Sequence, residues 1–138
     1  MTPEVEIVVP SDPRWLRVIR SVVQEFAEEI ACNSQERREI ALAVGEAVSN
    51  VIKHSYKGDP SRKLTLICRN PNARFEVEIR DEGEPFDAGT LIVRPPEEIR
   101  VGGRGVYLMR AVMDEVEYVR KGDTNCVRMS KMLQVHAR

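Results

Sequence analysis

Aromatic side chains are scarce in this sequence: only 5% of its 138 residues are Phe, Trp or Tyr, and Trp15 is the single tryptophan. Proteins that hold single-stranded nucleic acid stack bases on aromatic rings, so a surface of that kind is not expected. A bias toward one sign of charge is also missing, since the formal net charge is -1. Such a chain has no general attraction for nucleic acid or for an anionic membrane. We therefore expect no nucleic-acid partner and no membrane partner.

Cysteine is equally sparse, and the sequence has no long apolar run. Cys32, Cys68 and Cys126 are widely spaced and form no CxxC pair, which argues against a disulfide scaffold and against a structural zinc site. No apolar run approaches the ~20 residues of a membrane-spanning helix. The N-terminus carries acidic residues and prolines where a secretory signal would have a basic and then an apolar segment. These features predict a protein of the reducing cytoplasm.

What the sequence does contain is a succession of strand and helix patterns, and residues 1–138 are expected to form a single domain. Alternating apolar and polar residues predict strands, and an apolar residue every three to four positions predicts helices. The expected elements are strands at 4–9, 63–69, 74–80, 115–120 and 126–132, helices at 13–31, 33–56 and from 105, and an irregular segment at 88–104. This order predicts an α+β fold, a two-layer sandwich with helices on one face of a mixed or antiparallel sheet.

The helix expected at 33–56 carries the first group of functional residues. Asn33 with Glu36 three positions later matches a capping box, which favours a helix start there. Farther along, Glu46, Asn50 and His54 are spaced four apart, so a regular helix would stack them in one column. A carboxylate, an amide and an imidazole in a column suit metal and proton chemistry. On this stretch alone, an amphipathic helix with an ordinary polar side is the better interpretation.

The strand expected at 74–80 leads into a carboxylate on its apolar face. Phe75, Val77 and Ile79 alternate with polar residues, and continuing the alternation places Asp81 with the apolar ones. A carboxylate turned inward needs hydrogen-bond donors, which either turn amides or a bound ligand would supply. Gly83 follows and can take a backbone conformation closed to other residues.

A glycine-containing segment downstream is the third feature. Gly103-Arg104-Gly105 opens the helix expected from 105, and free N–H groups at a helix N-terminus bind anions well. The segment is not a Walker A loop, because the GxxxxGK[ST] pattern is missing. Taken alone, this segment could be a plain turn, and Asp81-Glu82-Gly83 could be any strand exit.

In this order and spacing, three segments make a more specific signal: GEAVSNVIKHSY (45–56), RDEGEPFD (80–87) and GGRGVYLMRAVMDEV (102–116). On these segments, and over nearly its whole length, the chain resembles the GHKL superfamily of ATP-binding domains, which have the Bergerat fold. Within that superfamily it is most similar to the bacterial anti-sigma factor serine-protein kinases. The resemblance implies that ATP and Mg2+ are the cofactors, that Asn50 binds the Mg2+, and that Glu46 is the general base.

The resemblance also implies contacts to the rest of the nucleotide. Asp81 would accept a hydrogen bond from the exocyclic amine of adenine, while Gly83 lets the backbone pass close to the base. The amides of Gly103 and Gly105 would contact the phosphates, and Arg104 could add positive charge there. Lys53 is a further phosphate candidate, although a lysine in that position could equally face solvent.

The chain departs from the family pattern in two places. Pro85 stands where a second glycine is expected, and Thr124-Asn125-Cys126 stands where relatives have a Gly-Thr pair. Thr124 could still supply the hydroxyl group near adenine.

By this resemblance, the protein is expected to be an ATP-dependent serine kinase in a partner-switching module. Such a kinase binds a sigma factor, phosphorylates a serine of a small anti-anti-sigma protein of the STAS type, and is a homodimer. The helix around Arg20 is a candidate docking surface. Two alternatives stay open: a nucleotide-dependent regulatory binder that transfers no phosphate, and a GHKL ATPase or histidine-kinase catalytic domain. The histidine-kinase version is disfavoured by Glu46, because histidine kinases of the superfamily generally have an amide there.

Overall fold

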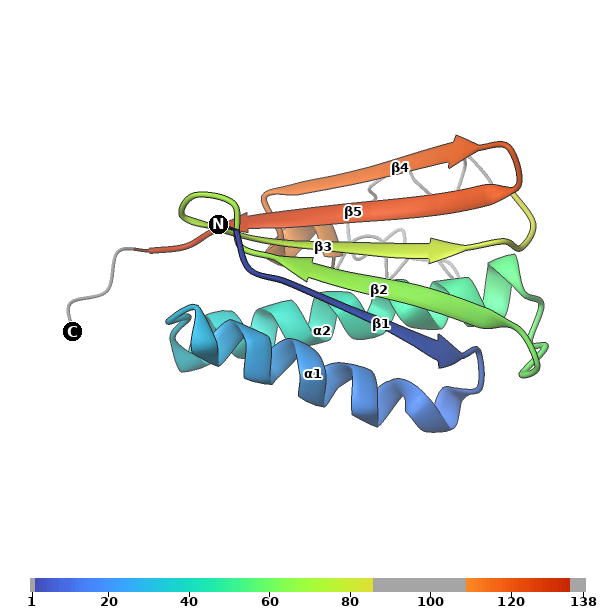
Figure 1. The fold of residues 1–138 in the computed structure, drawn as a ribbon, viewed down its shortest axis with the longest axis horizontal. Helices are drawn as coiled ribbons and strands as arrows, with labels where there is room; N and C mark the ends of the chain where they lie inside the picture. Colours follow the sequence, from blue (N-terminus) through green and yellow to red (C-terminus); the bar gives the residue numbers. More distant parts are fainter. Residues whose placement is uncertain (1, 86–108, 135–138) are drawn as a thin grey trace, which may run out of the picture.

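The computed structural model describes residues 2–85 and 109–134, which form two layers (Figure 1). One layer is a five-stranded sheet in the order β1-β2-β3-β5-β4, and every neighbouring pair is antiparallel. Its strands are β1 Glu4–Pro10, β2 Lys63–Arg69, β3 Arg74–Asp81, β4 Glu115–Lys121 and β5 Thr124–Met132. Because β3 pairs with β5 and not with β4, β4 lies at the edge of the sheet.

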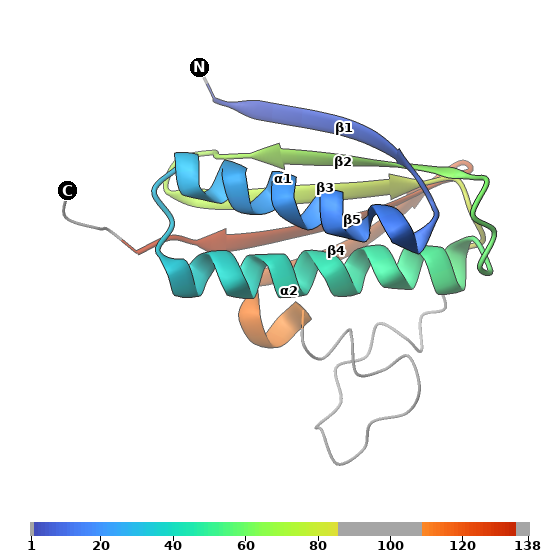
Figure 2. The same ribbon diagram turned by 90° about the horizontal axis from the view of Figure 1, so that it is seen from below.

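The second layer consists of two helices, α1 Leu16–Glu29 and α2 Ser34–Asn50, which cover the same face of the sheet (Figures 1 and 2). A short 3-10 helix, η1 Pro13–Trp15, precedes α1. The predicted capping box opens α2: the Asn33 side chain accepts the Glu36 N–H at 2.7 Å, and the Glu36 carboxylate accepts the Asn33 N–H at 2.9 Å. At its other end, α2 runs directly into a π-helix, η2 Val51–Ser55. None of the helices in the described part of the chain has the length and apolar content that crossing a bilayer requires.

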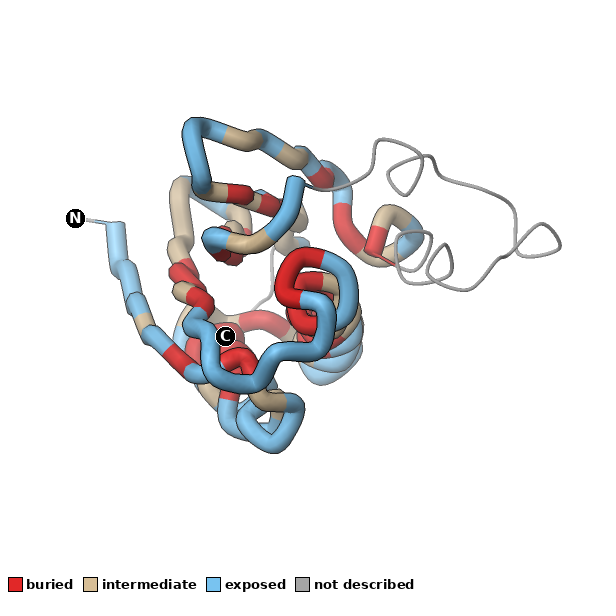
Figure 3. The backbone as a smooth tube through the Cα atoms, turned by 90° about the vertical axis from the view of Figure 1, so that its right-hand side faces the viewer, coloured by how far each residue is buried: buried red, intermediate tan, exposed pale blue. Residues whose placement is uncertain are grey.

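The core fills the space between the two layers. Phe26 of α1 meets Phe75 of β3 edge to face, with ring centroids 6.0 Å apart. Figure 3 shows exposed positions on the turns and on the helix sides away from the sheet. The fully buried large side chains are Ile19, Val23, Ile40, Val44, Val48, Leu64, Leu66, Ile67, Phe75, Ile79, Met109 and Met129.

The predicted fold class is confirmed, and the sheet is antiparallel rather than mixed. The element boundaries differ in two places that bear on function. The helix expected to continue regularly to residue 56 changes at Val51 to the wider π-helical turn, and β5 begins at Thr124, two residues earlier than expected. Of the helix expected from 105, residues 109–112 are described and are helical. The irregular segment 88–104 lies outside the described residues.

The sheet face away from the helices, called the outer face below, holds a buried charge. Glu78 is 2% exposed there and receives hydrogen bonds from Arg69, Arg80 and Arg128. The sequence placed Glu78 on this polar face, but the strand alternation could not show that three arginines from three strands would cover it.

Candidate functional site

Asp81 is the last residue of β3, and its side chain points toward the helical layer as the alternation predicts. It is 4% exposed. Its Oδ1 atom accepts hydrogen bonds from the Gly83 N–H and from the Asn125 side-chain amide, both at 2.9 Å. The Ser55 side chain also acts on this carboxyl group and lowers its pKa. One backbone donor and one side-chain donor of the described residues thus lie at hydrogen-bond distance from this inward carboxylate.

The environment of Asp81 favours its neutral form more than water does. Burial raises the pKa of the Asp81 carboxyl above its usual value, and the hydrogen bonds from Asn125, Gly83 and Ser55, with the nearby Arg120 cation, offset only part of that effect. A carboxylate has about four acceptor positions, and the Gly83 N–H and the Asn125 amide both use positions of Oδ1. The other oxygen of Asp81 therefore retains the capacity to accept a hydrogen bond.

The three residues after Asp81 are held by hydrogen bonds on both sides of their backbone. The Glu82 N–H donates to the Tyr56 hydroxyl at 2.9 Å and its carbonyl accepts from Arg62 at 3.0 Å. The Gly83 carbonyl accepts from Arg120 at 3.0 Å. The Glu84 N–H donates to the Ser55 carbonyl at 2.8 Å, and the Glu84 carbonyl accepts from the Asn125 amide at 2.7 Å. With the Gly83 N–H on Asp81, both backbone groups of residues 82, 83 and 84 are paired.

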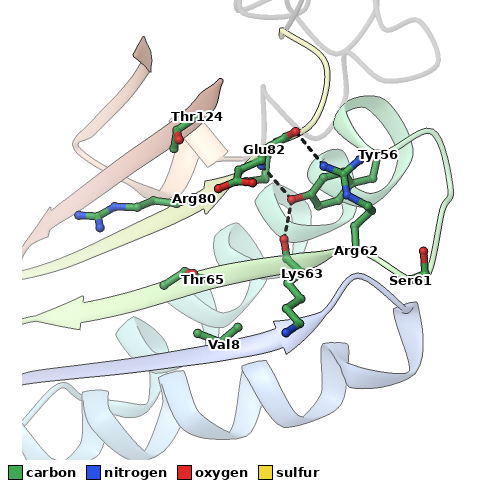
Figure 4. Close-up of a pocket in the computed structure, with 10 residues that line it drawn as sticks. Val8, Tyr56, Ser61, Arg62, Lys63, Thr65, Arg80, Glu82 and Thr124 are labelled. Carbon is green, nitrogen blue, oxygen red and sulfur yellow. Dashed lines mark hydrogen bonds between the residues drawn. The ribbon is translucent and has the colours of Figure 1, made fainter. Parts of the chain in front are cut away.

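The Tyr56 side chain links residues 82–84 to the start of β2. Figure 4 shows its hydroxyl group between the backbones of Glu82 and Lys63, and it donates to the Lys63 carbonyl while it accepts from Glu82. The Arg62 guanidinium lies over the Tyr56 ring, 4.7 Å from the centroid, and also reaches the Glu82 carbonyl. The exit of β3 is thus fixed to the end of α2 and to the start of β2.

The π-helix after α2 brings Ser55 to Asp81. The Tyr56 N–H donates to the Val51 carbonyl at 2.9 Å, an i to i-5 bond that makes the last turn wider than an α-helical one. Ser55 and Tyr56 are buried by this turn, while Lys53 and His54 are exposed. His54, which the sequence spaces four residues after Asn50, is thus an exposed residue of this wider turn.

Glu46 and Asn50 are both half-buried, one turn apart near the end of α2. Asn50 is the last residue of α2, and Ser55 is the last residue of the π-helix that follows it. The segment that follows them is tied to the exit of β3: the Ser55 carbonyl accepts the Glu84 N–H, and the Tyr56 hydroxyl accepts the Glu82 N–H. Lys53 is on the same segment with its side chain in solvent.

Thr124 is not the β5 residue that contacts Asp81. In the antiparallel register Asp81 lies opposite Asn125, and Asn125 is 2% exposed with its amide on the carboxylate. Since neighbouring residues of a strand point to opposite faces, Thr124 belongs to the outer face. Counting back from the apolar Val127 and Met129 would have identified Asn125 as the inward residue.

Ser55, Tyr56 and Arg120 are the other contacts that the sequence did not single out. Ser55 and Tyr56 follow His54 within the predicted helix, but which side they present depends on the π-helical turn. Arg120 is a surface-type residue whose role comes only from its place on β4.

Asp81 is one of the residues that line a hollow of about 590 Å3 (Figure 4). Its strand residues Val8, Thr65, Arg80 and Thr124 belong to the outer face, and Tyr56 and Glu82 line the same hollow beside Asp81 at the exit of β3.

Gly103, Arg104 and Gly105 lie outside the described residues. Within residues 2–85 and 109–134, no group of three or more His, Cys, Asp or Glu side chains could hold a metal ion. The predicted Mg2+ ligand, Asn50, is a single amide, and Mg2+ commonly takes one or two protein oxygens with phosphates and water in the other positions. The residues present therefore fit such an ion.

Comparison with known proteins places this geometry in a family context. Residues 9–131 match the family model described as histidine kinase-like ATPase domain. The serine-protein kinase RsbW of Bacillus subtilis is 31% identical over 137 residues, which cover 94% of this chain and 85% of that protein. The serine-protein kinase RsbW of Bacillus licheniformis is 29% identical over 138 residues, with 94% and 85% covered.

Solved structures show the same fold. A structure of the RsbU and RsbW domains of Rv1364c from Mycobacterium tuberculosis superposes with a TM-score of 0.71 at 18% identity, covering 99% of this chain and 34% of that chain. A histidine kinase domain from a blue-light activated kinase of Erythrobacter litoralis superposes with a TM-score of 0.56 at 17% identity, covering 91% and 62%.

Proposed function

Because the chain belongs to the histidine kinase-like ATPase domain family and, within it, to the serine-protein kinases, we propose that it phosphorylates a serine of an anti-anti-sigma protein and binds a sigma factor. Residues 1–138 act as one domain in this proposal. The observation that carries the proposal is the buried Asp81 carboxylate at the end of β3, whose Oδ1 accepts two hydrogen bonds while its other oxygen keeps acceptor capacity. An exocyclic amine of a purine is a donor of the kind that this acceptor fits.

The two half-buried residues of α2 supply the chemistry in this proposal. ATP bound with Mg2+ provides the phosphoryl group that is transferred. The Asn50 amide oxygen holds the ion, and the Glu46 carboxylate, one helical turn away, accepts the proton of the incoming serine hydroxyl. Lys53 is exposed and can turn toward the phosphates. The contacts of Gly103, Arg104 and Gly105 to the phosphates rest on the sequence pattern.

The proposed partners are two proteins that compete for the same kinase. One is a sigma factor, and the other is a small STAS-type anti-anti-sigma protein that is released once its serine is phosphorylated. Arg20 of α1 is exposed, and its guanidinium group packs against Gly45 of α2. Gly45 directly precedes Glu46, so Arg20 is the proposed docking residue close to the general base. We propose a homodimer that acts in the cytoplasm, where sigma factors work.

Phosphate transfer can be tested with labelled ATP, Mg2+ and a STAS-type protein that carries the acceptor serine. We expect a labelled serine with the wild type, and no labelled serine with Glu46→Gln, which should still bind ATP because the base does not hold the nucleotide. Glu117→Gln, the same change at an exposed position of the outer face, serves as the matched control and should transfer phosphate normally. Nucleotide binding without any labelled serine would instead support a purely regulatory binder.

Nucleotide binding itself can be measured through stability. At a ligand concentration about 100 times its dissociation constant, Mg-ATP should stabilise the fold by ~2.7 kcal/mol. A melting curve that Mg-ATP leaves unchanged would contradict the proposed site.

A further inference from the structure

The hydrogen-bond partners of Asn125 permit only one orientation of its side-chain amide. Its side chain is buried, with Oδ1 2.9 Å from the Arg120 guanidinium and Nδ2 2.9 Å from Asp81 Oδ1. Arg120 has only donors, so the amide oxygen of Asn125 must face it. The amide NH2 group must then face Asp81 and the Glu84 carbonyl, which lies 2.7 Å away. Arg120 therefore sets which way the Asn125 amide points.

This arrangement acts on one oxygen of Asp81. Oδ1 accepts both the Gly83 N–H and the Asn125 amide, which use its two lone pairs. A carboxylate fixed by one oxygen cannot rotate freely, so the direction of its other oxygen is fixed as well. The same Arg120 nitrogen also holds the Gly83 carbonyl at 3.0 Å, which ties the amide and the turn together.

We propose that Asn125 and Arg120 are positioning residues of the nucleotide site: Arg120 orients the Asn125 amide, and Asn125 orients Asp81 so that its remaining acceptor faces the exocyclic amine of the purine. The inference rests on the proposed function, since it requires that Asp81 reads the base. In this proposal, Arg120, Asn125 and Asp81 together distinguish a purine with an exocyclic amine from one with a carbonyl group at the same ring position; Asp81 alone does not. Oriented groups discriminate because a mismatched partner leaves a buried polar group unpaired.

The test compares ATP with inosine triphosphate, which carries a carbonyl oxygen in place of the exocyclic amine. Dissociation constants are measured by titration calorimetry for the wild type and for Asn125→Asp, which keeps the shape but turns the donor into an acceptor. We expect the variant to lose roughly tenfold or more in ATP affinity, the size of one hydrogen bond to a charged group. The inosine triphosphate affinity should be nearly unchanged, so the ratio between the two nucleotides falls.

Two further variants test whether Arg120 orients the Asn125 amide, and they remain informative if Asn125→Asp does not fold. Arg120→Met removes the donor that orients the amide and should lower the same ratio, whereas Arg120→Lys keeps a donor and should restore most of it. Asn72→Asp is the matched control, because it makes the same chemical change at an exposed turn position at the other end of β3.

The outcomes separate the inference from the proposed function. An unchanged ratio in both Asn125→Asp and Arg120→Met, or an equal loss of both nucleotides, would overturn the positioning role. Wild-type protein that binds neither nucleotide would overturn the proposed nucleotide site and this inference with it. Wild-type protein that binds both equally would overturn the reading of the base by Asp81, and so this inference, while the nucleotide site would stand.

Discussion

Gly83 lies directly against the carbonyl group of Ser55: a Cβ atom at position 83 would stand 2.3 Å from the Ser55 oxygen and 2.6 Å from its carbonyl carbon. The same carbonyl accepts the Glu84 N–H at 2.8 Å. Since the nearest atoms are backbone, no flexible side chain can move aside. The glycine of RDEGEPFD is therefore needed for the contact between the end of β3 and the end of α2, whether or not a nucleotide is bound.

Replacing Gly83 by Ala should separate these two segments. We expect a loss of about 1–3 kcal/mol in the free energy of unfolding, the usual cost of overpacking, together with weaker ATP binding. Urea denaturation and an ATP titration measure the two effects. Gly122→Asn is the control, because Gly122 has a φ of +59° with open space around it and asparagine tolerates that region. Equal destabilisation of both variants would contradict the steric explanation.

Gly45→Ala should have a different outcome from Gly83→Ala. Its Cβ would meet the end of a flexible side chain, the Arg20 guanidinium, with Nη2 at 2.8 Å and Nε at 2.9 Å. Alanine is favoured over glycine inside a helix by about 1 kcal/mol, so displacing Arg20 should leave the protein as stable or slightly more stable. If Arg20 is a docking residue, the variant should nevertheless bind its protein partners less tightly. Melting temperature and partner affinity are the measurements, and unchanged affinity would remove Arg20 from the docking surface.

Asp81→Asn should abolish the acceptor for the base while it leaves the fold intact. Burial raises the pKa of the Asp81 carboxyl, so the folded state takes up a proton more readily than the unfolded state, and this group's contribution to stability is lost as pH rises through that pKa. At neutral pH, the variant should thus be as stable as the wild type or more so, with ATP affinity reduced roughly tenfold or more.

The wild type should also bind ATP less tightly as pH falls through the raised pKa, because the amine of the base prefers the ionised carboxylate. The charged or titratable side chains that interact with this carboxyl among the described residues are Arg120 and Tyr56. Asp123→Asn, in the exposed turn between β4 and β5, provides the control for the same substitution. A large loss of stability in Asp81→Asn at neutral pH would contradict this account.

Glu78→Gln should destabilise the sheet and change its response to acid. Burial alone would raise the pKa of Glu78, but the hydrogen bonds from Arg69 and Arg80 and the charge of Arg128 lower it from 4.5 to about 2. The carboxylate therefore stabilises the fold above pH 4.5, and that contribution is lost as pH falls toward 2. At neutral pH, we expect the variant to lose about 1–3 kcal/mol, because three arginines lose their shared partner.

Urea denaturation at neutral and at acid pH measures this effect. Glu76→Gln is the matched control: Glu76 is also paired with Arg69, at 3.2 Å, but its side chain is 17% exposed, and among the described residues it forms an ion pair with this one arginine. That pair should contribute no more than about 1 kcal/mol. Equal losses in the two variants would show that burial of Glu78 adds nothing.

The sequence by itself determined the elements and most of their faces. The alternation in RFEVEIRD placed Phe75, Val77, Ile79 and Asp81 on the inner face, and the capping box fixed the start of α2. These features are local, because the strand period and the helix cap each involve residues a few positions apart. The order of the elements was then enough for the two-layer α+β fold.

Only the tertiary structure decided which side chains meet around Asp81. Ser55 reaches it because the helix widens after Asn50, and Asn125 reaches it because β5 starts at Thr124 and pairs with β3 in one particular register. Arg120 comes from an edge strand, and Glu78 is buried by arginines from two other strands as well as its own. Contacts of this kind depend on strand register and on close approach between segments distant in sequence, and a one-residue shift turns every side chain of a strand to the opposite face.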